Sequence, residues 1–332
     1  MSSLREEAKD FIGPGWTVRL LVAGVVLYLL LAVLVGMYWS RTPDLFEVTA
    51  DARDTVGVAT TRTLIQVSRT LLDKPGGFVS NDILPPGVWL DNVPNWEYGV
   101  LIQVRDLTRA LRESFSRSQS QSREDVDLAR AEPRLNFSNR SWAVPASESE
   151  YRDGIRHLSR YLKRLSDSED SQAQFYARAD NLRYWLAIVD SRLGSLSQRL
   201  SASVGAPRFN TDLAGDASAR QSTAAAGQID VRTPWLEIDD VFFEARGTTW
   251  ALIHFLRAVE IDFADVLANK NAAVSLRQII RELEATQQPL YSPIVLNGSG
   301  FGVLANHSLV MASYVSRANA AIADLRDLLS QG

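Results

Sequence analysis

The stretch from Leu20 to Ser40 constrains this chain more than any other feature, because about 21 successive residues carry no charge. As an α-helix it would measure about 32 Å, enough to cross a hydrocarbon core of about 30 Å. Trp16 lies just before the run, and Tyr38 and Trp39 close it, as interfacial aromatic residues do. The run is longer than the apolar part of a signal peptide, and no cleavage site of small residues follows it. We therefore predict an uncleaved membrane anchor at residues 20–40.

The tail before the anchor, residues 1–19, is short and contains Arg5, Lys9 and Arg19. Because a short tail before a first span usually stays inside the cell, we predict a cytoplasmic N-terminus and a periplasmic bulk, residues 41–332. No comparable apolar run follows. The expected location is therefore the bacterial inner membrane, crossed once. Ala32 and Gly36 form one small-xxx-small pair in the span, which weakly favours a homo-oligomer.

The composition argues against several classes of function. A formal net charge of −4 and a pI near 5.6 do not suit a nucleic-acid-binding surface. The absence of cysteine excludes disulfides, thiolate metal sites and a cysteine nucleophile. We expect no cofactor and no metal site. The expected partners are the lipid bilayer and other envelope or membrane proteins.

Helical periodicity fills most of the chain after the anchor. Apolar residues at alternating spacings of three and four predict amphipathic helices over residues 54–73, 97–111, 151–165, 175–200, 238–266, 276–283 and 311–329. The alternation in 175–200 lasts about four heptads, which is typical of a coiled-coil-like seam. Such narrow apolar faces must pack against one another. The expected fold is all-α, with one N-terminal transmembrane helix followed by an elongated antiparallel helical bundle with long coiled-coil-like helices.

Two details of the bundle follow from its connections. The helices 151–165 and 175–200 should form an antiparallel hairpin, because only a short polar turn joins them. Thr233 and Pro234 resemble the N-cap and first residue of the next helix, which would run about 50 Å unless it bends at Gly247. We divide the soluble part into a membrane-proximal helical region, 41–146, and a long-helix bundle, 147–332.

Several distinctive motifs connect the chain to a known family. They are YWSRTPDLF, LLDKPGGFVSND, PPGVWLDNVPNWEYG, FSRSQSQS and NGSGFGVLANHSLVMASYVSRANAAI. Together they resemble domain-of-unknown-function family 2333, a bacterial family of single-span membrane proteins. The resemblance covers nearly the whole chain and implies an inner-membrane bacterial protein. It implies no activity and no catalytic residues.

The segment 74–99 is the main candidate for a site. It lacks helical periodicity and is too apolar for disorder, so we predict an ordered loop rich in Trp, Asn and Pro. Its tryptophans and acidic or amide side chains suit stacking on a sugar or gripping a partner: Asp82, Trp89, Asp91, Asn92, Asn95 and Trp96. The alternative is structural, with both tryptophans closing one end of the bundle and the Asx residues holding turns.

Weaker candidates lie elsewhere. The glycine-rich turn at Gly298, Ser299 and Gly300 offers backbone N–H groups to an anion, although its spacing is not that of a nucleotide-binding loop. His157 and His254 fall off the apolar seams and are expected to face solvent. Acidic residues at the start of the long helix suit a helix N-terminus better than a cation site: Glu237, Asp239, Asp240 and Glu244.

No Ser-His-Asp order, HExxH or GxSxG motif is present. The leading hypothesis is a membrane-anchored periplasmic helical adaptor or scaffold in an envelope assembly, without catalysis. One alternative is an envelope carbohydrate-binding protein or hydrolase that uses the loop 74–99. Another is the ectodomain of a sensor acting through a partner, since a tail of 19 residues is too short for an output domain.

Overall fold

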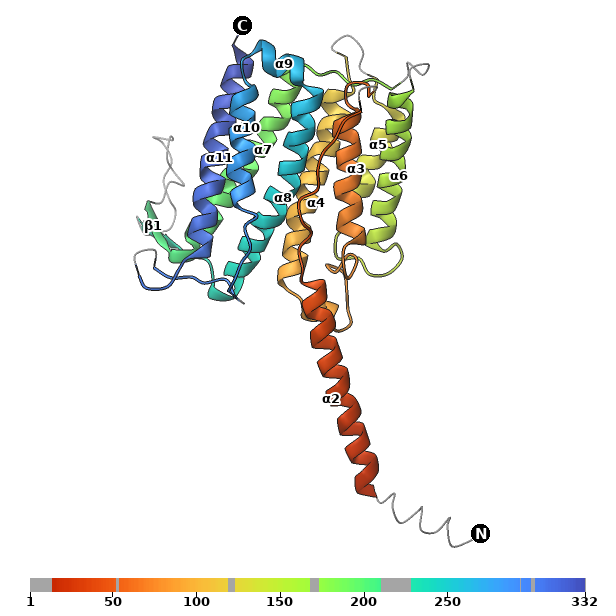
Figure 1. Ribbon diagram of the computed structural model, residues 1–332, viewed down its shortest axis with the longest axis vertical. Helices are drawn as coiled ribbons and strands as arrows, with labels where there is room; N and C mark the ends of the chain where they lie inside the picture. Colours follow the sequence, from red (N-terminus) through yellow and green to blue (C-terminus); the bar gives the residue numbers. More distant parts are fainter. Residues whose placement is uncertain are drawn as a thin grey trace, which may run out of the picture.

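The computed structural model describes residues 14–51, 54–118, 123–167, 173–209, 228–292, 294–299 and 302–331. Over these residues the protein is a bundle of helices with one long helix leaving at one end (Figure 1). This confirms the all-α fold class. One small addition was not expected, an antiparallel pair of strands, β1 (Ala206–Phe209) and β2 (Gln228–Val231).

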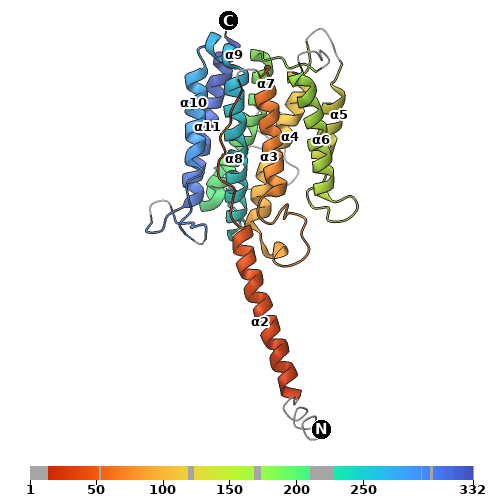
Figure 2. The same cartoon turned by 45° about the vertical axis from the view of Figure 1, so that its right-hand side comes forward.

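The helix that leaves the bundle is α2 (Pro14–Trp39). Within the described part of the chain it is the one helix long and apolar enough to cross a membrane. It meets that test over Gly15–Trp39, with a mean hydropathy of 2.8 in its most apolar part. An N-terminal helix of this kind is a membrane anchor or a signal sequence. Most of its side chains are exposed because the helix extends away from the bundle (Figure 2).

An extended segment, residues 41–51, connects α2 to the opposite end of the bundle. It lies along α8 (Ile238–Asp262). Trp250 Nε1 donates to the Asp44 carbonyl at 3.3 Å, and the Phe46 N–H donates to His254 Nε2 at 3.1 Å. Arg257 Nη1 donates to the Phe46 carbonyl at 3.3 Å. The segment thus covers a face of α8 that would otherwise meet solvent.

Helix α3 (Val58–Asp73) begins four residues later than predicted. Gly57 just before it has a φ of 94°, a conformation that favours glycine, and Phe175 packs against its α-carbon. The carboxylate of Asp262, at the end of α8, accepts from the N–H groups of Gly57 at 2.8 Å and Thr60 at 2.6 Å. A residue about 200 positions away therefore caps this helix.

The remaining helices alternate in direction. They are α4 (Asn92–Ala110), the π-helical turn η2 (Leu111–Phe115), α5 (Val126–Leu135), α6 (Ser147–Ser166), α7 (Ala179–Ser201), α9 (Ala264–Asn269), α10 (Ala273–Ala285) and α11 (His307–Ser330). Short 3-10 turns are η1 (Gly87–Trp89), η3 (Ala202–Val204) and η4 (Trp235–Glu237). Helix α4 starts five residues before the predicted Glu97. Helix α5 was not expected, since Pro133 lies inside it.

The predicted N-cap at Thr233 and the predicted length of the long helix are wrong, although its apolar seam does begin at Ile238. Thr233 Oγ1 lies 3.4 Å from the Arg199 carbonyl instead of capping a helix, and α8 begins only at Ile238, after η4. With 25 residues α8 is about 38 Å long. It continues through Gly247, where a side chain would meet the Trp96 carbonyl of α4 at 2.0 Å. The helix is unbroken at Gly247, and the glycine serves close helix packing.

The predicted hairpin of α6 and α7 is also wrong. Helix α6 packs on α5 and α3, whereas α7 packs mainly on α11. Helix α4 packs mainly on α8. The reason is the segment 173–178, which crosses the end of the bundle. Phe175 there contacts the rings of Phe115 and Phe263, and the Tyr176 N–H donates to the Phe115 carbonyl at 2.7 Å. These contacts separate the two helices. Buried residues before and after residue 146 belong to one continuous core.

Four connections lie at the end of the bundle from which α2 leaves (Figures 1 and 2). They are residues 74–91, 136–146, 202–237 and 286–306, so far as the structure describes them. We call them the basal loops. The chain reverses direction at each, because α3, α5, α7 and α10 all end there.

Candidate functional site

The predicted loop residues divide between the surface and the core. Asp91 is the N-cap of α4, where its side chain accepts from the Asn92 N–H at 2.8 Å. Asn92, Asn95 and Trp96 therefore lie in the first turns of a helix. Trp89 lies just before them in η1 and is exposed. Trp89, Asp91 and Asn92 do come together, on the wall of a groove of about 870 Å³ at the base of the bundle.

Trp96, Asn95 and Asp82 point elsewhere. Trp96 is buried in the core, with its ring 5.3 Å from that of Trp250. Asn95 Nδ2 donates to Asp240 Oδ1 at 2.5 Å. Asp82 packs against Gly87, and burial raises its pKa, with Glu97 adding to the effect. The structure therefore does not bring all six residues into one site.

A buried ion pair holds the first part of this loop in place. Lys74 Nζ lies 2.6 Å from Glu97 Oε1, and both side chains are almost completely buried. Glu97 also accepts from the N–H groups of Val79 and Ser80, each at 2.8 Å. Lys74 Nζ also donates to the Gly77 carbonyl at 2.5 Å, so the pair fixes the loop to α4 and is a structural element.

The acidic residues at the start of α8 lie where the sequence predicts them. Asp239 and Asp240 are in its first turn. Burial, followed by the charges of Asp239 and Asp91, raises the pKa of Asp240 to about 6. No group of three or more ligating side chains that could hold a metal ion occurs among the described residues.

The glycine-rich turn is used by its own hairpin. The Gly298 N–H donates to the Ala305 carbonyl at 3.0 Å, and a side chain at residue 298 would meet the Leu304 carbonyl at 2.0 Å. Ser299 packs beside Gly302. Gly300 lies outside the described residues. Gly298 therefore has no free N–H to offer an anion.

The expectation that His254 faces solvent is wrong, because the segment 41–51 covers it. His254 is fully buried and stacks on Phe46, with ring centroids 3.8 Å apart. Its Nδ1 lies 2.7 Å from the Trp250 carbonyl. Burial lowers the pKa of His254 to about 4, so the ring is neutral at pH 7.

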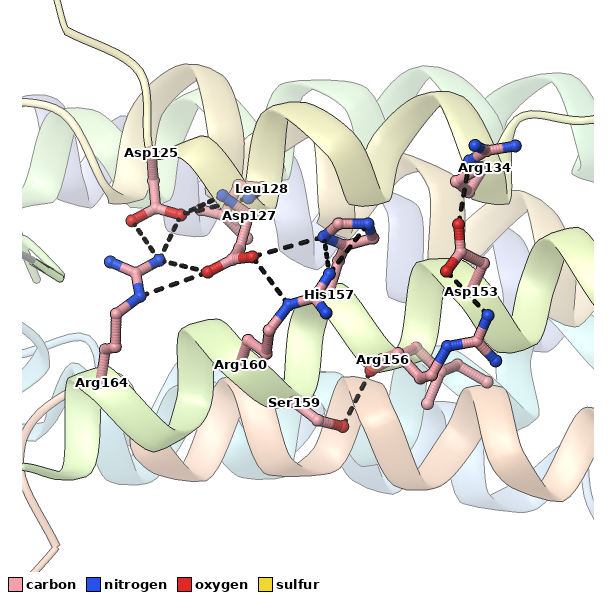
Figure 3. A network of polar contacts seen from close by, with 11 residues as sticks. Asp125, Asp127, Leu128, Arg134, Asp153, Arg156, His157, Ser159, Arg160 and Arg164 are labelled. Carbon is pink, nitrogen blue, oxygen red and sulfur yellow. Dashed lines mark hydrogen bonds and ion pairs between the residues drawn. The ribbon is translucent and has the colours of Figure 1, made fainter.

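His157 is also buried, within a charged network between α5 and α6 (Figure 3). Its Nδ1 lies 3.3 Å from Asp127 Oδ1. Arg160 and Arg164 donate to the same carboxylate, and Arg164 also binds Asp125, the N-cap of α5. Burial tends to raise the pKa of Asp127, but the hydrogen bonds from Arg164, His157 and Arg160 outweigh it and lower that pKa. The network joins two helices.

A groove that the sequence analysis did not anticipate runs between α4 and α7, with α8 beside it. Its volume is about 760 Å³. We call it the α4–α7 groove. Its walls carry tyrosines together with polar and charged side chains: Tyr98, Gln103, Asp106, Arg109, Tyr184, Ser191, Arg192, Ser195, Arg199 and Glu244. On α7 the lining runs from Tyr184 to Arg199, about 22 Å along the helix axis.

Two ion pairs cross or border this groove. Arg192 Nε donates to Asp106 Oδ2 at 2.8 Å, and Arg199 pairs with Glu244. The hydrogen bond to Asp106 is the main reason that the pKa of Arg192 is raised. Both arginines are about half exposed, whereas Asp106 and Glu244 are nearly buried. The guanidinium groups therefore face the groove while they stay bound to their carboxylates, because an open pair would leave a buried charge alone.

Gln103 distinguishes this groove from an ordinary surface depression. It lines the groove but is 0% exposed, and neither its Nε2 nor its Oε1 has a hydrogen-bond partner. A buried, unpaired amide costs about 1–3 kcal/mol, so such groups are rare. The sequence carried a signal for it. Val100, Gln103 and Leu107 share helical spacing, which puts a polar residue on the buried face of α4.

Comparison with known proteins gives one match. The sequence model of a family described as "Uncharacterized protein conserved in bacteria (DUF2333)" matches residues 12–332. This agrees with the resemblance read from the motifs. No curated protein and no solved structure matches the chain.

Proposed function

This chain belongs to the bacterial DUF2333 family, and from that premise we propose that it is a membrane-anchored periplasmic scaffold that binds a peptide segment of another envelope protein in the α4–α7 groove. The proposal treats α2 as an uncleaved anchor, with the bundle on the periplasmic side of the inner membrane. The scaffold acts by holding its partner near the membrane and needs no catalysis of its own.

The observation that carries this proposal is the unpaired amide of Gln103. A primary amide offers a donor and an acceptor side by side, which matches the carbonyl and N–H of a peptide backbone. Both Gln103 atoms are without partners in the structure. Because Gln103 is fully buried, a segment reaches these atoms only after the side chains that cover them move aside, and it then recovers hydrogen bonds that folding has left unmade.

The dimensions and lining of the groove also suit an extended peptide. A length of about 22 Å on α7 corresponds to six or seven residues of extended chain. Tyr98 and Tyr184 are partly exposed and provide apolar area with a polar tip. Arg192 and Arg199 are about half exposed and present their guanidinium groups to a bound segment while they keep their present carboxylates. The partner segment is therefore expected to be polar, with tyrosine contacts along it.

Site-specific photo-cross-linking tests the proposal in cells. A photoreactive amino acid replaces Ser191, an exposed residue that lines the groove. The matched control is the same replacement at Arg183, which is exposed on the same helix but does not line the groove. We expect a discrete cross-linked product from Ser191 and none from Arg183.

The substitution Gln103→Met tests whether formation of the cross-linked product depends on the Gln103 amide. It should weaken the cross-link at Ser191 while the protein remains folded and at its normal level. A product that is equal at Ser191 and Arg183, or that persists unchanged in the Gln103→Met background, would contradict the proposed binding mode.

A further inference from the structure

The tryptophans of this chain fall into three environments. Of the eight, three are buried in the core and two flank the apolar run of α2. The remaining three lie in three different basal loops and are 53, 62 and 71% exposed: Trp89, Trp142 and Trp235. Tryptophan is enriched where protein meets the membrane–water interface, because its ring is apolar and its N–H is polar. Every tryptophan outside the core thus lies at α2 or at the end of the bundle next to it.

Three of the four basal loops also contain a long uncharged stretch. No charged residue occurs in 83–90, 141–147 or 288–306. Tyr291 and Val303, in the last of these, are almost fully exposed. Exposed apolar residues gathered at one end of a molecule mark an interaction surface. Since several loops far apart in sequence contribute, the surface is a property of the whole end of the bundle.

One basal loop packs directly on α2. A Cβ atom at Gly36 would lie 3.6 Å from both Pro86 Cβ and Leu90 Cδ2. Gly36 precedes the end of α2 at Trp39 by about 4.5 Å along the helix axis. Loop residues 86–90 therefore share the depth of the last turn of the apolar helix. Trp39 in turn packs against Gly76, which fixes the end of α2 to a second part of the same loop.

We propose that the basal loops are immersed in the surface of the leaflet from which α2 emerges, so that the bundle rests on the bilayer instead of swinging above it. The occupant of this surface is lipid, because the loop that contacts Gly36 lies beside the apolar run itself. The inference rests on the proposed function only in taking α2 as a membrane span. It adds a contact surface, its residues and a fixed orientation.

Single-cysteine labelling tests this inference, since the chain has no cysteine of its own. The full chain is placed in nanodiscs of phosphatidylethanolamine and phosphatidylglycerol and labelled with an environment-sensitive fluorophore. Three variants carry the label in basal loops: Leu84→Cys, Val144→Cys and Leu236→Cys. Two controls carry it on exposed residues at the starts of α3 and α10, helices that end at basal loops: Val56→Cys and Val274→Cys.

We expect blue-shifted emission at the basal sites and quenching by doxyl-labelled lipid, with neither effect at the control sites. Basal labels that emit and quench like the controls would overturn the inference. A further label at Leu30, within α2, separates the two proposals. If Leu30→Cys reports lipid while the basal labels report water, only the immersion fails. If Leu30→Cys also reports water, the anchor fails with it.

Discussion

The substitution Gln103→Met tests the central physical claim about the α4–α7 groove, apart from any partner. Methionine has a similar length and volume but needs no hydrogen bonds. If both amide atoms of Gln103 are unpaired in the free protein, their replacement removes a desolvation penalty of about 1–3 kcal/mol. A protein of this size shifts its melting temperature by about 2 °C per kcal/mol, so an increase of roughly 2–6 °C is expected.

The assay is thermal unfolding of the full chain in one detergent, followed by tryptophan fluorescence. Thr108→Val on the same helix is the matched control. Thr108 is also fully buried, but its hydroxyl donates to the Val104 carbonyl at 2.7 Å. This control should be neutral or lose about 0.5–1.5 kcal/mol, because it removes a hydrogen bond that is already made. If Gln103→Met is destabilised as Thr108→Val is, the amide is satisfied in the free protein. The argument for a peptide ligand then fails.

Three further outcomes are expected. Gly99→Ala should lower stability by about 1–3 kcal/mol or more in thermal unfolding, because the new Cβ would lie 2.1 Å from the Glu244 carbonyl oxygen. The control Gly194→Ala should raise stability by up to about 1 kcal/mol, because the atom nearest to its new Cβ is 3.5 Å away. Lys74→Met should lower stability by about 3–5 kcal/mol by leaving the Glu97 charge buried alone, and adding Glu97→Gln should recover part of it in a double-mutant cycle. The folded-state pKa of His254, about 4, lies below its ordinary value of 6.5. The contribution of the neutral ring to the free energy of unfolding is therefore complete above pH 6.5 and declines toward pH 4. We expect a loss of up to about 3 kcal/mol in urea unfolding at successive pH values, and a smaller slope in His254→Gln.

The helices could be predicted from sequence because their apolar seams are local signals. Leu182, Leu186, Val189 and Leu193 repeat at three and four, and all are buried in α7. Which helices pack against each other was harder to predict, because an apolar seam shows that a face is buried but not which helix covers it. The crossing segment at Phe175 decides that question through contacts with residues 60 and 88 positions away (Phe115 and Phe263). The prediction that His254 faces solvent failed for the same reason, because the segment 41–51 that covers it is distant in sequence.

The candidate site shows the same limit. Trp89 and Asp91 were found as surface residues of a groove because aromatic and Asx residues mark loops. Gln103 was not singled out, because one polar residue on an apolar face can always find a partner in the fold, and periodicity alone does not show whether it does. Only the arrangement of α4 and α7 around it shows that both amide atoms stay unpaired.

Together the two proposals determine how far from the membrane a partner must reach. If the basal loops rest in the leaflet, Asn92 at the start of α4 lies near the bilayer surface, and Gln103 lies 11 residues further along the helix. At 1.5 Å per residue the amide stands about 16 Å above that surface. A partner segment that follows its own membrane span therefore needs about five extended residues between the span and the groove. A bundle that moved freely about residue 40 would impose no such minimum. The shortest linker that still permits the cross-link at Ser191 therefore tests whether the basal loops stay in the leaflet.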